Sequence, residues 1–193
     1  TAEKTNPVYA ACDLILEILN KLPVTVVRAS DYECDDAIAV LAHDLKDEEV
    51  IIISNDSDFI QLLQEPQLNV QVYNPPKKIF MSPPDYHYVA WKSLRGDKSD
   101  NIPKLMSDNK AIQTVSKPEL LQQFLSFSEN RAAFDKNRSL IELRIFDAEL
   151  LELSSGTTDL DFVKAYFQKL DFQTMLKEEY WSKFSSAFSG LNL

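Results

Sequence analysis

The acidic stretch Glu33-Cys34-Asp35-Asp36 is the first place in the chain where chemistry is expected, because it carries three carboxyl groups in four residues. Carboxylates held this close repel one another, so a fold that gathers them needs a cation or must raise their pKa values. Helix capping is the alternative, since the macrodipole favours Asp and Glu in a first helical turn. The stretch therefore predicts either a cation site or an acidic helix start.

A second acidic motif, Ser54-Asn55-Asp56-Ser57-Asp58, directly follows the apolar run Val50–Ile53. Ligands of open α/β sheets bind outside the carboxyl ends of the strands, which predicts that Asp56 and Asp58 face such a crevice. An Asx turn or a helix cap would use the same residue types. Two acidic strand ends in one sheet make the binding site the better explanation.

The third motif reads Gly96-Asp97-Lys98-Ser99-Asp100-Asn101-Ile102-Pro103. If Asp97 opens a helical turn, Asp100 shares its face and both side chains can point at one ion. A cap or turn remains the alternative here too. Hard oxygen ligands in this number suit Mg²⁺ or Mn²⁺, whereas zinc would want Cys or His at matched spacing. His43 and His87 lack such partners, so we expect structural or surface roles for them.

The elements that must position these motifs alternate between helix and strand. Apolar positions at helical spacing predict a helix over 7–22, followed by a buried strand over 24–27. Ser30 and Glu33 form a capping-box pattern before a helix that continues over 37–45. The β-branched run 50–53 predicts a strand covered on both faces, as in a parallel sheet.

The pattern continues with a short helix, a third strand and a possible edge strand, at 59–63, 70–73 and 77–81. Alternation of this kind predicts an α/β layer with a parallel sheet. Pro83-Pro84 starts a helix that Gly96 stops near Arg95. From residue 97 onward we expect helices only, at 117–127, 129–145 and 160–170.

Composition sets the outer limits. A chain of 193 residues with 45% hydrophobic content can bury one globular core. It has no run of about 20 apolar residues that would span a bilayer, and Thr1 begins no secretion signal. Two cysteines, Cys12 and Cys34, predict buried reduced thiols in a cytoplasmic protein. The net charge of −10 argues against nucleic-acid binding, but seven of the acids lie in the three motifs, where bound metal would reverse the local field.

The three motifs together resemble the 5′-nuclease family, which includes flap endonucleases, the 5′-exonuclease domains of bacterial DNA polymerases and bacteriophage RNase H. The resemblance runs from about residue 8 to 103 and rests on Glu33-x-Asp35-Asp36-Ala37, Ser54-Asn55-Asp56-Ser57-Asp58-Phe59-x-Gln61-Leu62 and Gly96-Asp97-Lys98-Ser99-Asp100-Asn101-Ile102-Pro103. It implies a PIN-like α/β core over 1–96 and a helical C-terminal region over 97–193 with a degenerate helix-hairpin-helix-like segment.

The resemblance also implies a metal-dependent 5′-3′ exonuclease or flap endonuclease with two Mg²⁺ or Mn²⁺ ions. By motif position, Glu33, Asp35 and Asp36 resemble ligands of the first metal group, together with Asp56 and Asp58. Asp97 and Asp100 resemble the residues that complete the second position. The implied substrate is a DNA or RNA–DNA duplex with a 5′ end or flap, and a single-stranded-DNA-binding protein is an implied partner.

This sequence departs from the family pattern in two ways. No strand with an early Asp ligand and no basic helical arch precedes Thr1, so we expect a missing amino-terminal part or a separate amino-terminal chain. The segment after Asp97 lacks the family's glycines, which resembles phage RNase H and implies a protein of the bacterial host cytoplasm. The phosphate contacts left for it are Lys98, Lys104, Lys110 and Lys117, which are equally explained as solvated surface.

Two other interpretations remain open at the sequence level. Loss of the early ligand would leave a non-catalytic nucleic-acid-binding module, and a PIN-type RNA endonuclease would share the core acids. The aromatic residues after 160 fall near helical spacing, which favours core packing or partner docking over base stacking. They are Tyr166, Phe167, Phe172, Tyr180, Trp181, Phe184 and Phe188.

Overall fold

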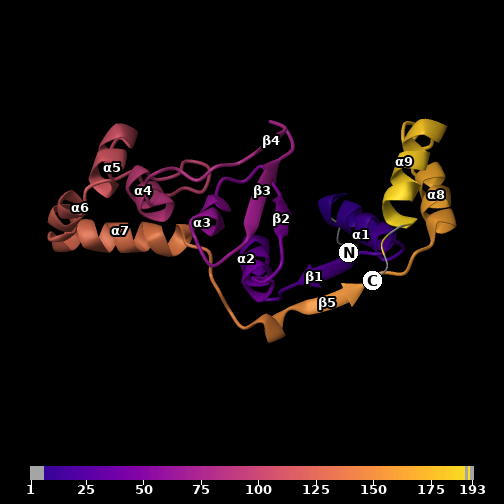
Figure 1. The fold of residues 1–193 in the computed structure, drawn as a ribbon, viewed down its shortest axis with the longest axis horizontal. Helices are drawn as coiled ribbons and strands as arrows, with labels where there is room; N and C mark the ends of the chain where they lie inside the picture. Colours follow the sequence, from indigo (N-terminus) through magenta and orange to yellow (C-terminus); the bar gives the residue numbers. More distant parts are fainter. Residues whose placement is uncertain (1–6, 190, 192–193) are drawn as a thin grey trace, which may run out of the picture. The chain divides into compact units, whose positions relative to one another are not determined.

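The computed structural model describes residues 7–189 and residue 191 and divides into two compact units (Figure 1). Unit 1 comprises Thr1–Ser30 with Leu151–Leu193, and unit 2 comprises Asp31–Leu150. The boundary expected after residue 96 therefore falls inside unit 2. Among the described residues, no helix is both long enough and apolar enough to cross a membrane.

Unit 1 joins the two ends of the described chain through one strand pair. Strand β1 pairs antiparallel with β5, with Thr25 opposite Ser155. The expectation of helices only after residue 97 is therefore wrong, and so is the expectation that the first strand is buried, since β1 has no buried residue. Strand propensity alone does not specify a partner or a covered face. The elements of unit 1 are α1 (Pro7–Leu19), β1 (Thr25–Arg28), β5 (Glu152–Ser155), α8 (Leu160–Lys169) and α9 (Glu178–Ser189).

The core of unit 1 is aromatic. Phe167 is 5% exposed, and its ring centroid lies 5.5 Å from that of Phe184 and 6.2 Å from that of Trp181. Leu22 and Val163 complete the buried cluster. This packing confirms the predicted core role of Phe167, Trp181, Phe184 and Phe188, whereas Phe172 and Tyr180 are 45% and 44% exposed.

Unit 2 begins with a three-stranded sheet in the order β2-β3-β4 (Figure 1). The predicted parallel pairing is confirmed for β2 and β3, with Val50 opposite Val70, whereas the edge strand β4 is antiparallel. These α/β elements are α2 (Cys34–Asp44), β2 (Val50–Ile53), α3 (Ile60–Leu63), β3 (Val70–Asn74) and β4 (Ile79–Phe80).

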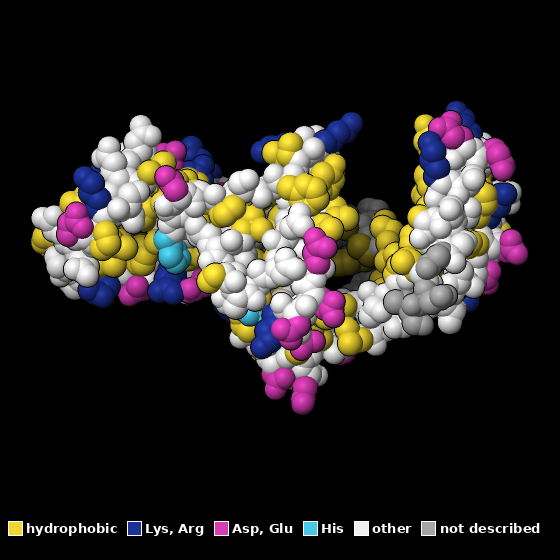
Figure 2. All heavy atoms as spheres, viewed as in Figure 1, with side chains coloured by type: hydrophobic (Ala, Val, Ile, Leu, Met, Phe, Trp, Pro, Cys, Tyr) yellow, Lys and Arg dark blue, Asp and Glu magenta, His cyan; other side chains and the backbone are white. Residues whose placement is uncertain are grey.

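Only one face of this sheet is covered in the described structure. Ile52 is 7% exposed and packs with Ala39 and Phe59, whereas Ile51 and Ile53 are 52% and 71% exposed. The expectation of a strand covered on both faces is wrong, because alternate side chains of a strand point to opposite faces and the packed helices cover only one. Figure 2 shows hydrophobic side chains at the surface over these strands.

Two local expectations at α2 and α1 also fail. Glu33, not Ser30, is the N-cap of α2, and its side chain makes no capping bond. The Ser30 hydroxyl instead donates to Glu152 Oε1 at 3.3 Å. Cys12 on α1 and Cys34 in the first turn of α2 are exposed rather than buried.

The second half of unit 2 is a helical subassembly in which α4 packs against α5 and α7. Its core contains Leu94, Met106, Ala111 and Phe134. α4 begins at Tyr88 rather than at the prolines, and the His87 ring nitrogen caps it by accepting from the Ala90 N–H at 3.3 Å. The elements are α4 (Tyr88–Arg95), α5 (Asp108–Val115), α6 (Pro118–Leu125), α7 (Ser128–Ile141) and the 3₁₀ turn η1 (Ala148–Leu150).

A buried asparagine ties this subassembly to the Gly-Asp loop. Asn137 on α7 is 1% exposed, and its amide donates to the carbonyls of Ser93 and Pro103 at 2.8 Å each. One side chain therefore fixes the end of α4 and the far end of the loop that follows it. A buried carbonyl that loses its partner carries the full cost of desolvation.

Asn137→Ala should lower the free energy of unfolding by about 1–3 kcal/mol, because it removes the donor from the buried Ser93 carbonyl. Urea unfolding followed by circular dichroism measures the change. Asn109→Ala, at an exposed position of α5, is the matched control and should stay within about 0.5 kcal/mol of the wild type. Equal effects of the two substitutions would contradict the proposed role of Asn137.

Candidate active site

The acidic residues of all three motifs lie in unit 2, on segments that are far apart in the sequence. Each comes from the end of a regular element, where backbone geometry leaves side chains free to converge. The residues are Glu33 at the N-cap of α2, Asp35 and Asp36 in its first turn, Asp56 and Asp58 in the loop after β2, and Asp97 and Asp100 after α4.

The loop after β2 is shaped by its own side chains. The Asp56 N–H donates to Ser54 Oγ at 3.0 Å, and the Asp58 N–H donates to Asp56 Oδ1 at 2.9 Å. These are the Asx-type contacts that the sequence offered as an alternative to a binding site. The turn does not exclude an acidic site here, because it orients the Asp58 side chain towards Lys92 on α4.

The ammonium of Lys92 lies among three of the carboxylates. Its Nζ is 2.5 Å from Asp58 Oδ1, 3.0 Å from Asp97 Oδ2 and 3.9 Å from Asp100 Oδ2, and its side chain is 3% exposed. We call Lys92 with Asp58, Asp97 and Asp100 the Lys92 cluster. It joins the strand-end motif to the Gly-Asp motif through a residue that the sequence analysis missed.

A signal for Lys92 was nevertheless present in the sequence. Residues three and four positions apart share a face of a helix, so Lys92 falls on the same face as Tyr88 and Val89. All three are buried. A lysine on the buried face of a helix needs a paired carboxylate, since an isolated ammonium is too costly to desolvate.

Electrostatics keep Lys92 charged. Burial by itself lowers the pKa of Lys92, but the hydrogen bond and charge of Asp58, together with Asp97, more than reverse this and raise the pKa above its ordinary value. Tyr88 supports the same carboxylate, because its hydroxyl lies 3.0 Å from Ser57 Oγ and 3.2 Å from Asp58 Oδ1. Burial raises the pKa of Tyr88 to about 12, so its hydroxyl remains a donor.

Asp97 is held by the loop that it opens. Its Oδ1 accepts from the Ser99 N–H at 2.9 Å, and this bonding to Ser99, with that from Lys92, lowers the pKa of Asp97 to about 2. The expected helical turn is absent: Asp97 and Ile102 form an antiparallel bridge that closes a tight loop. That geometry still leaves Asp97 and Asp100 facing one ammonium.

Gly96 makes this loop possible. Its φ is +74°, a left-handed conformation, and an added Cβ would lie 2.7 Å from the carbonyl oxygen of Ile102. Glycine is therefore required here for both conformation and space. The loop runs so close to the end of α4 that the N–H groups of Leu105 and Met106 both donate to the Leu94 carbonyl, at 2.9 and 3.0 Å.

The acids of α2 and the β2 loop form the other part of the site. The pKa of Asp35 is raised by burial and then by the charges of Asp56, Asp58, Glu33 and Asp36. We call Glu33, Asp35 and Asp56 the open carboxylate group. Asp35 thus lies in the field of the strand-end acids, with no cation among the causes of its shift.

Asp36 is set apart from the other acids by its burial. It is 8% exposed, and its Oδ1 accepts from the Arg144 N–H at 2.8 Å, which fixes the segment that follows α7. Within the described ranges, no group of three or more His, Cys, Asp or Glu side chains is arranged so that it could hold a metal ion. The carboxylates lie around Lys92 and Asp35 without converging on one point.

The lysines singled out for phosphate contact are all exposed. Lys98 and Lys104 line a cavity of about 820 Å³ beside Asp97, whereas Lys110 on α5 and Lys117 at the N-cap of α6 are not part of its lining. Figure 2 shows Lys and Arg side chains distributed over the helical half of unit 2 on the face drawn.

The two histidines take the structural or surface roles expected of them. His43 Nε2 lies 3.3 Å from Glu65 Oε2, and His87 caps α4.

Lys92→Met should destabilise the chain by up to about 3–5 kcal/mol, the cost of removing one partner from a buried ion pair. The physical reason is that Asp58 and Asp97 would face each other with no cation between them. Urea unfolding in EDTA near neutral pH measures the effect. Lys98→Met, an exposed lysine of the adjacent loop, is the matched control, and a loss as large as that of Lys92→Met would sink the assignment.

Asp97 should also make stability depend on acid. Its folded pKa of about 2 lies below the ordinary 3.8, so its contribution is present above pH 3.8 and is lost as the pH falls towards 2. Asp97→Asn should therefore be less stable than the wild type near neutral pH, with a difference that shrinks through this window. A difference that is constant with pH, measured by urea unfolding in EDTA, would show that Asp97 is not held as described.

Comparison with known proteins shows which family this chain resembles. Residues 3–90 match the family model of the 5′-3′ exonuclease N-terminal resolvase-like domain. The chain is 29% identical over 195 residues to a thermostable DNA polymerase I of Thermus filiformis, covering 86% of this chain and 23% of that protein. It is 31% identical over 109 residues to a 5′-3′ exonuclease of Buchnera aphidicola, covering 51% of this chain and 37% of that protein.

A 5′-3′ exonuclease of Aquifex aeolicus is 29% identical over 203 residues, covering 90% of this chain and 68% of that protein. The chain thus spans less than two fifths of the first two relatives. The region matched to the family model contains two of the three acidic motifs, at 33–36 and 54–58, and the α/β elements of unit 2. The resemblance predicted from the motifs is confirmed: residues 3–90 match the resolvase-like domain of 5′-3′ exonucleases, and the relatives that match this chain are 5′-3′ exonucleases and DNA polymerases I.

Proposed function

We propose that this chain hydrolyses phosphodiester bonds at the 5′ ends of RNA primers or DNA flaps during replication, as a 5′-3′ exonuclease and flap endonuclease of the phage RNase H type. The observation that carries the proposal is that carboxylates from three distant segments lie near one another, around Asp35 and around Lys92. Asp35 lies in the field of Asp56 and Asp58, and Lys92 links Asp58 to Asp97. The match to 5′-3′ exonucleases supports the same chemistry.

The chemistry of the donors suits divalent cations, while no three of the described acids are arranged to hold one in this structure. The side chains offer hard carboxylate oxygens, which Mg²⁺ and Mn²⁺ prefer. A cation, the Lys92 ammonium, already lies among three of them, and burial together with the charges of neighbouring acids raises the pKa of Asp35. Glu33, Asp35 and Asp56, with Asp58, would hold one ion, while Asp97 and Asp100 would serve the second position. When bound, two such ions activate a water and stabilise the leaving oxygen.

The chain's own residues prepare the site for that chemistry. Lys92 and Tyr88 orient Asp58, and Ser99 orients Asp97, so these oxygens are held in place before substrate arrives. Lys98, Lys104, Lys110 and Lys117 would neutralise phosphates of a DNA or RNA–DNA duplex along the helical half of unit 2. Placement matters, because a misplacement of about 1 Å can cost on the order of a hundredfold in rate.

A second candidate function is a nucleic-acid-binding module without hydrolysis. One observation favours it: Lys92 neutralises part of the acidic site without any metal. The two candidates differ in what divalent metal does. In a nuclease, metal binding and turnover depend on the same carboxylates, whereas a binding module needs neither.

Asp56→Asn should reduce cleavage of 5′-labelled flap, nicked and RNA–DNA substrates by at least about a hundredfold. It should also reduce the rise in melting temperature that Mg²⁺ or Mn²⁺ gives the wild type, because a ligand that binds only the native state stabilises it by mass action. Nuclease assays and thermal melts with and without metal measure the two effects.

Asp135→Asn, an exposed carboxylate on α7, is the matched control for charge and residue type. It should leave both readouts unchanged. Metal-independent melting of the wild type, or near-normal cleavage by Asp56→Asn, would contradict the proposal.

A further inference from the structure

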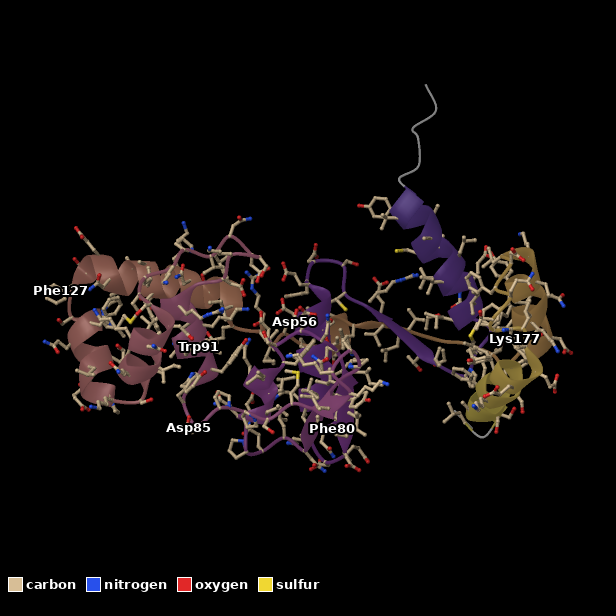
Figure 3. All side chains as sticks on the ribbon, turned by 90° about the horizontal axis from the view of Figure 1, so that it is seen from above. Asp56, Phe80, Asp85, Trp91, Phe127 and Lys177 are labelled. Carbon is tan, nitrogen blue, oxygen red and sulfur yellow. The ribbon has the colours of Figure 1, made fainter. Side chains whose placement is uncertain are left out.

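A small aromatic cavity lies directly beside the acidic site. It has a volume of about 290 Å³ and is lined by Tyr86, Tyr88, Trp91 and Arg95, and also by Ser57 and Asp97 of the acidic segments. Figure 3 labels Asp56 and Trp91, which come from the loop after β2 and from α4. The cavity therefore connects an aromatic surface on α4 with the carboxylates.

The rings form a cleft rather than a closed stack. The centroid of Trp91 lies 5.6 Å from that of Tyr86 and 5.5 Å from that of Tyr88, with the ring planes inclined by 47° and 46°. The Arg95 guanidinium lies 5.0 Å from the centroid of the Trp91 ring. Flat π surfaces with an adjacent cation are the elements with which proteins bind unpaired bases.

Trp91 is also held in place before any ligand binds. Its Nε1 donates to Asp108 Oδ1 at 2.9 Å, and its ring also packs against the core cluster that includes Leu94 and Phe134. The indole is half-buried, so core packing accounts for part of its surface and the cavity for another part. A ring fixed in this way loses little conformational entropy when a ligand stacks on it.

The size of the cavity selects its occupant. Pockets for drug-sized ligands start at about 300 Å³, so this cavity accommodates one ring system rather than an extended ligand. Ser57, Lys92 and Asp97 of the acidic site also line this cavity, so a ring bound in it would lie next to the carboxylates. Arg95 at the end of α4, with Lys98 and Lys104 of the following loop, lines the neighbouring cavity and supplies positive charge for the strand.

We propose that the cavity formed by Tyr86, Tyr88, Trp91 and Arg95 binds one unpaired nucleobase of the nucleic-acid strand whose phosphate lies at the acidic site. The inference rests on the proposed nuclease function for the identity of the ligand, but it concerns binding and requires no hydrolysis. Stacking is tolerant of sequence because every base has a π face. The subsite therefore distinguishes an unpaired nucleotide from a bare backbone.

The test measures binding of the full chain to a single-stranded oligothymidylate and to an abasic oligonucleotide of the same length, at low salt in EDTA. Trp181→Phe leaves Trp91 as the only tryptophan, since the chain has two. Its fluorescence should be quenched by the oligothymidylate and not by the abasic strand. In that background, anisotropy with labelled oligonucleotides gives both affinities.

Trp91→Leu, made without the Trp181→Phe change, should weaken oligothymidylate binding by about 5- to 100-fold. Its affinity for the abasic strand should be unchanged. Trp91→Phe, which keeps a ring, should retain most of the preference for bases and guards against a folding defect in the leucine variant. Phe80→Leu is the matched control, because Phe80 on β4 is 52% exposed and lies outside the cavity lining (Figure 3).

Equal affinity of the wild type for the two strands would overturn the inference, as would a preference for bases that survives Trp91→Leu. The result is separable from that of the nuclease assays. If cleavage depends on Asp56 but the chain binds both strands equally, the proposed base-binding cavity is wrong and the nuclease function stands. If binding depends on the bases and on Trp91 but no metal-dependent cleavage is found, the base-binding cavity is supported and the nuclease function is contradicted.

Discussion

The ammonium of Lys92 is the contact on which the site depends. Asp58 comes from the end of β2, while Asp97 and Asp100 come from the loop after α4, and mutual repulsion would drive these segments apart. A single cation 2.5 Å and 3.0 Å from two of the carboxylates reverses the sign of that interaction. Because Lys92 is 3% exposed, water screens its charge very little. The sheet and the helical half of unit 2 are thereby joined at the acidic site.

The rest of unit 2 holds the partners of Lys92 in place. Asn137 fixes both ends of the Gly-Asp loop from α7, and Gly96 allows the loop to turn back onto α4. The hydrophobic cluster around Leu94 and Phe134 sets the distance between those helices. Packing that is remote from the acids therefore determines where their oxygens lie, which is the requirement that hydrolysis places on a site.

The two parts of the acidic site differ in how their charge is balanced. The Lys92 cluster carries its own counter-ion, whereas Asp35 is subject to repulsion from Asp56 and Asp58. A chain with a formal charge of −10 is a poor match for a polyanion unless cations are added where the acids are densest. In the proposed function divalent ions fill that role, and exposed lysines and the aromatic cavity contact the strand around them.

The sequence by itself determined the resemblance to 5′-nucleases, the α/β alternation and the three acidic motifs, because these depend on residue types at short spacing. Helical periodicity located α1, α6, α7 and α8, and β-branched runs located β1, β2 and β3. Tertiary structure decided everything that depends on distant partners. β1 pairs with β5 across more than a hundred residues, only one face of β2 is covered, and the compact units do not divide at residue 96. The role of Lys92 and the aromatic cavity beside it were also decided by tertiary structure. Burial of a lysine and convergence of side chains from α4 and the β2 loop depend on packing, which local spacing does not encode.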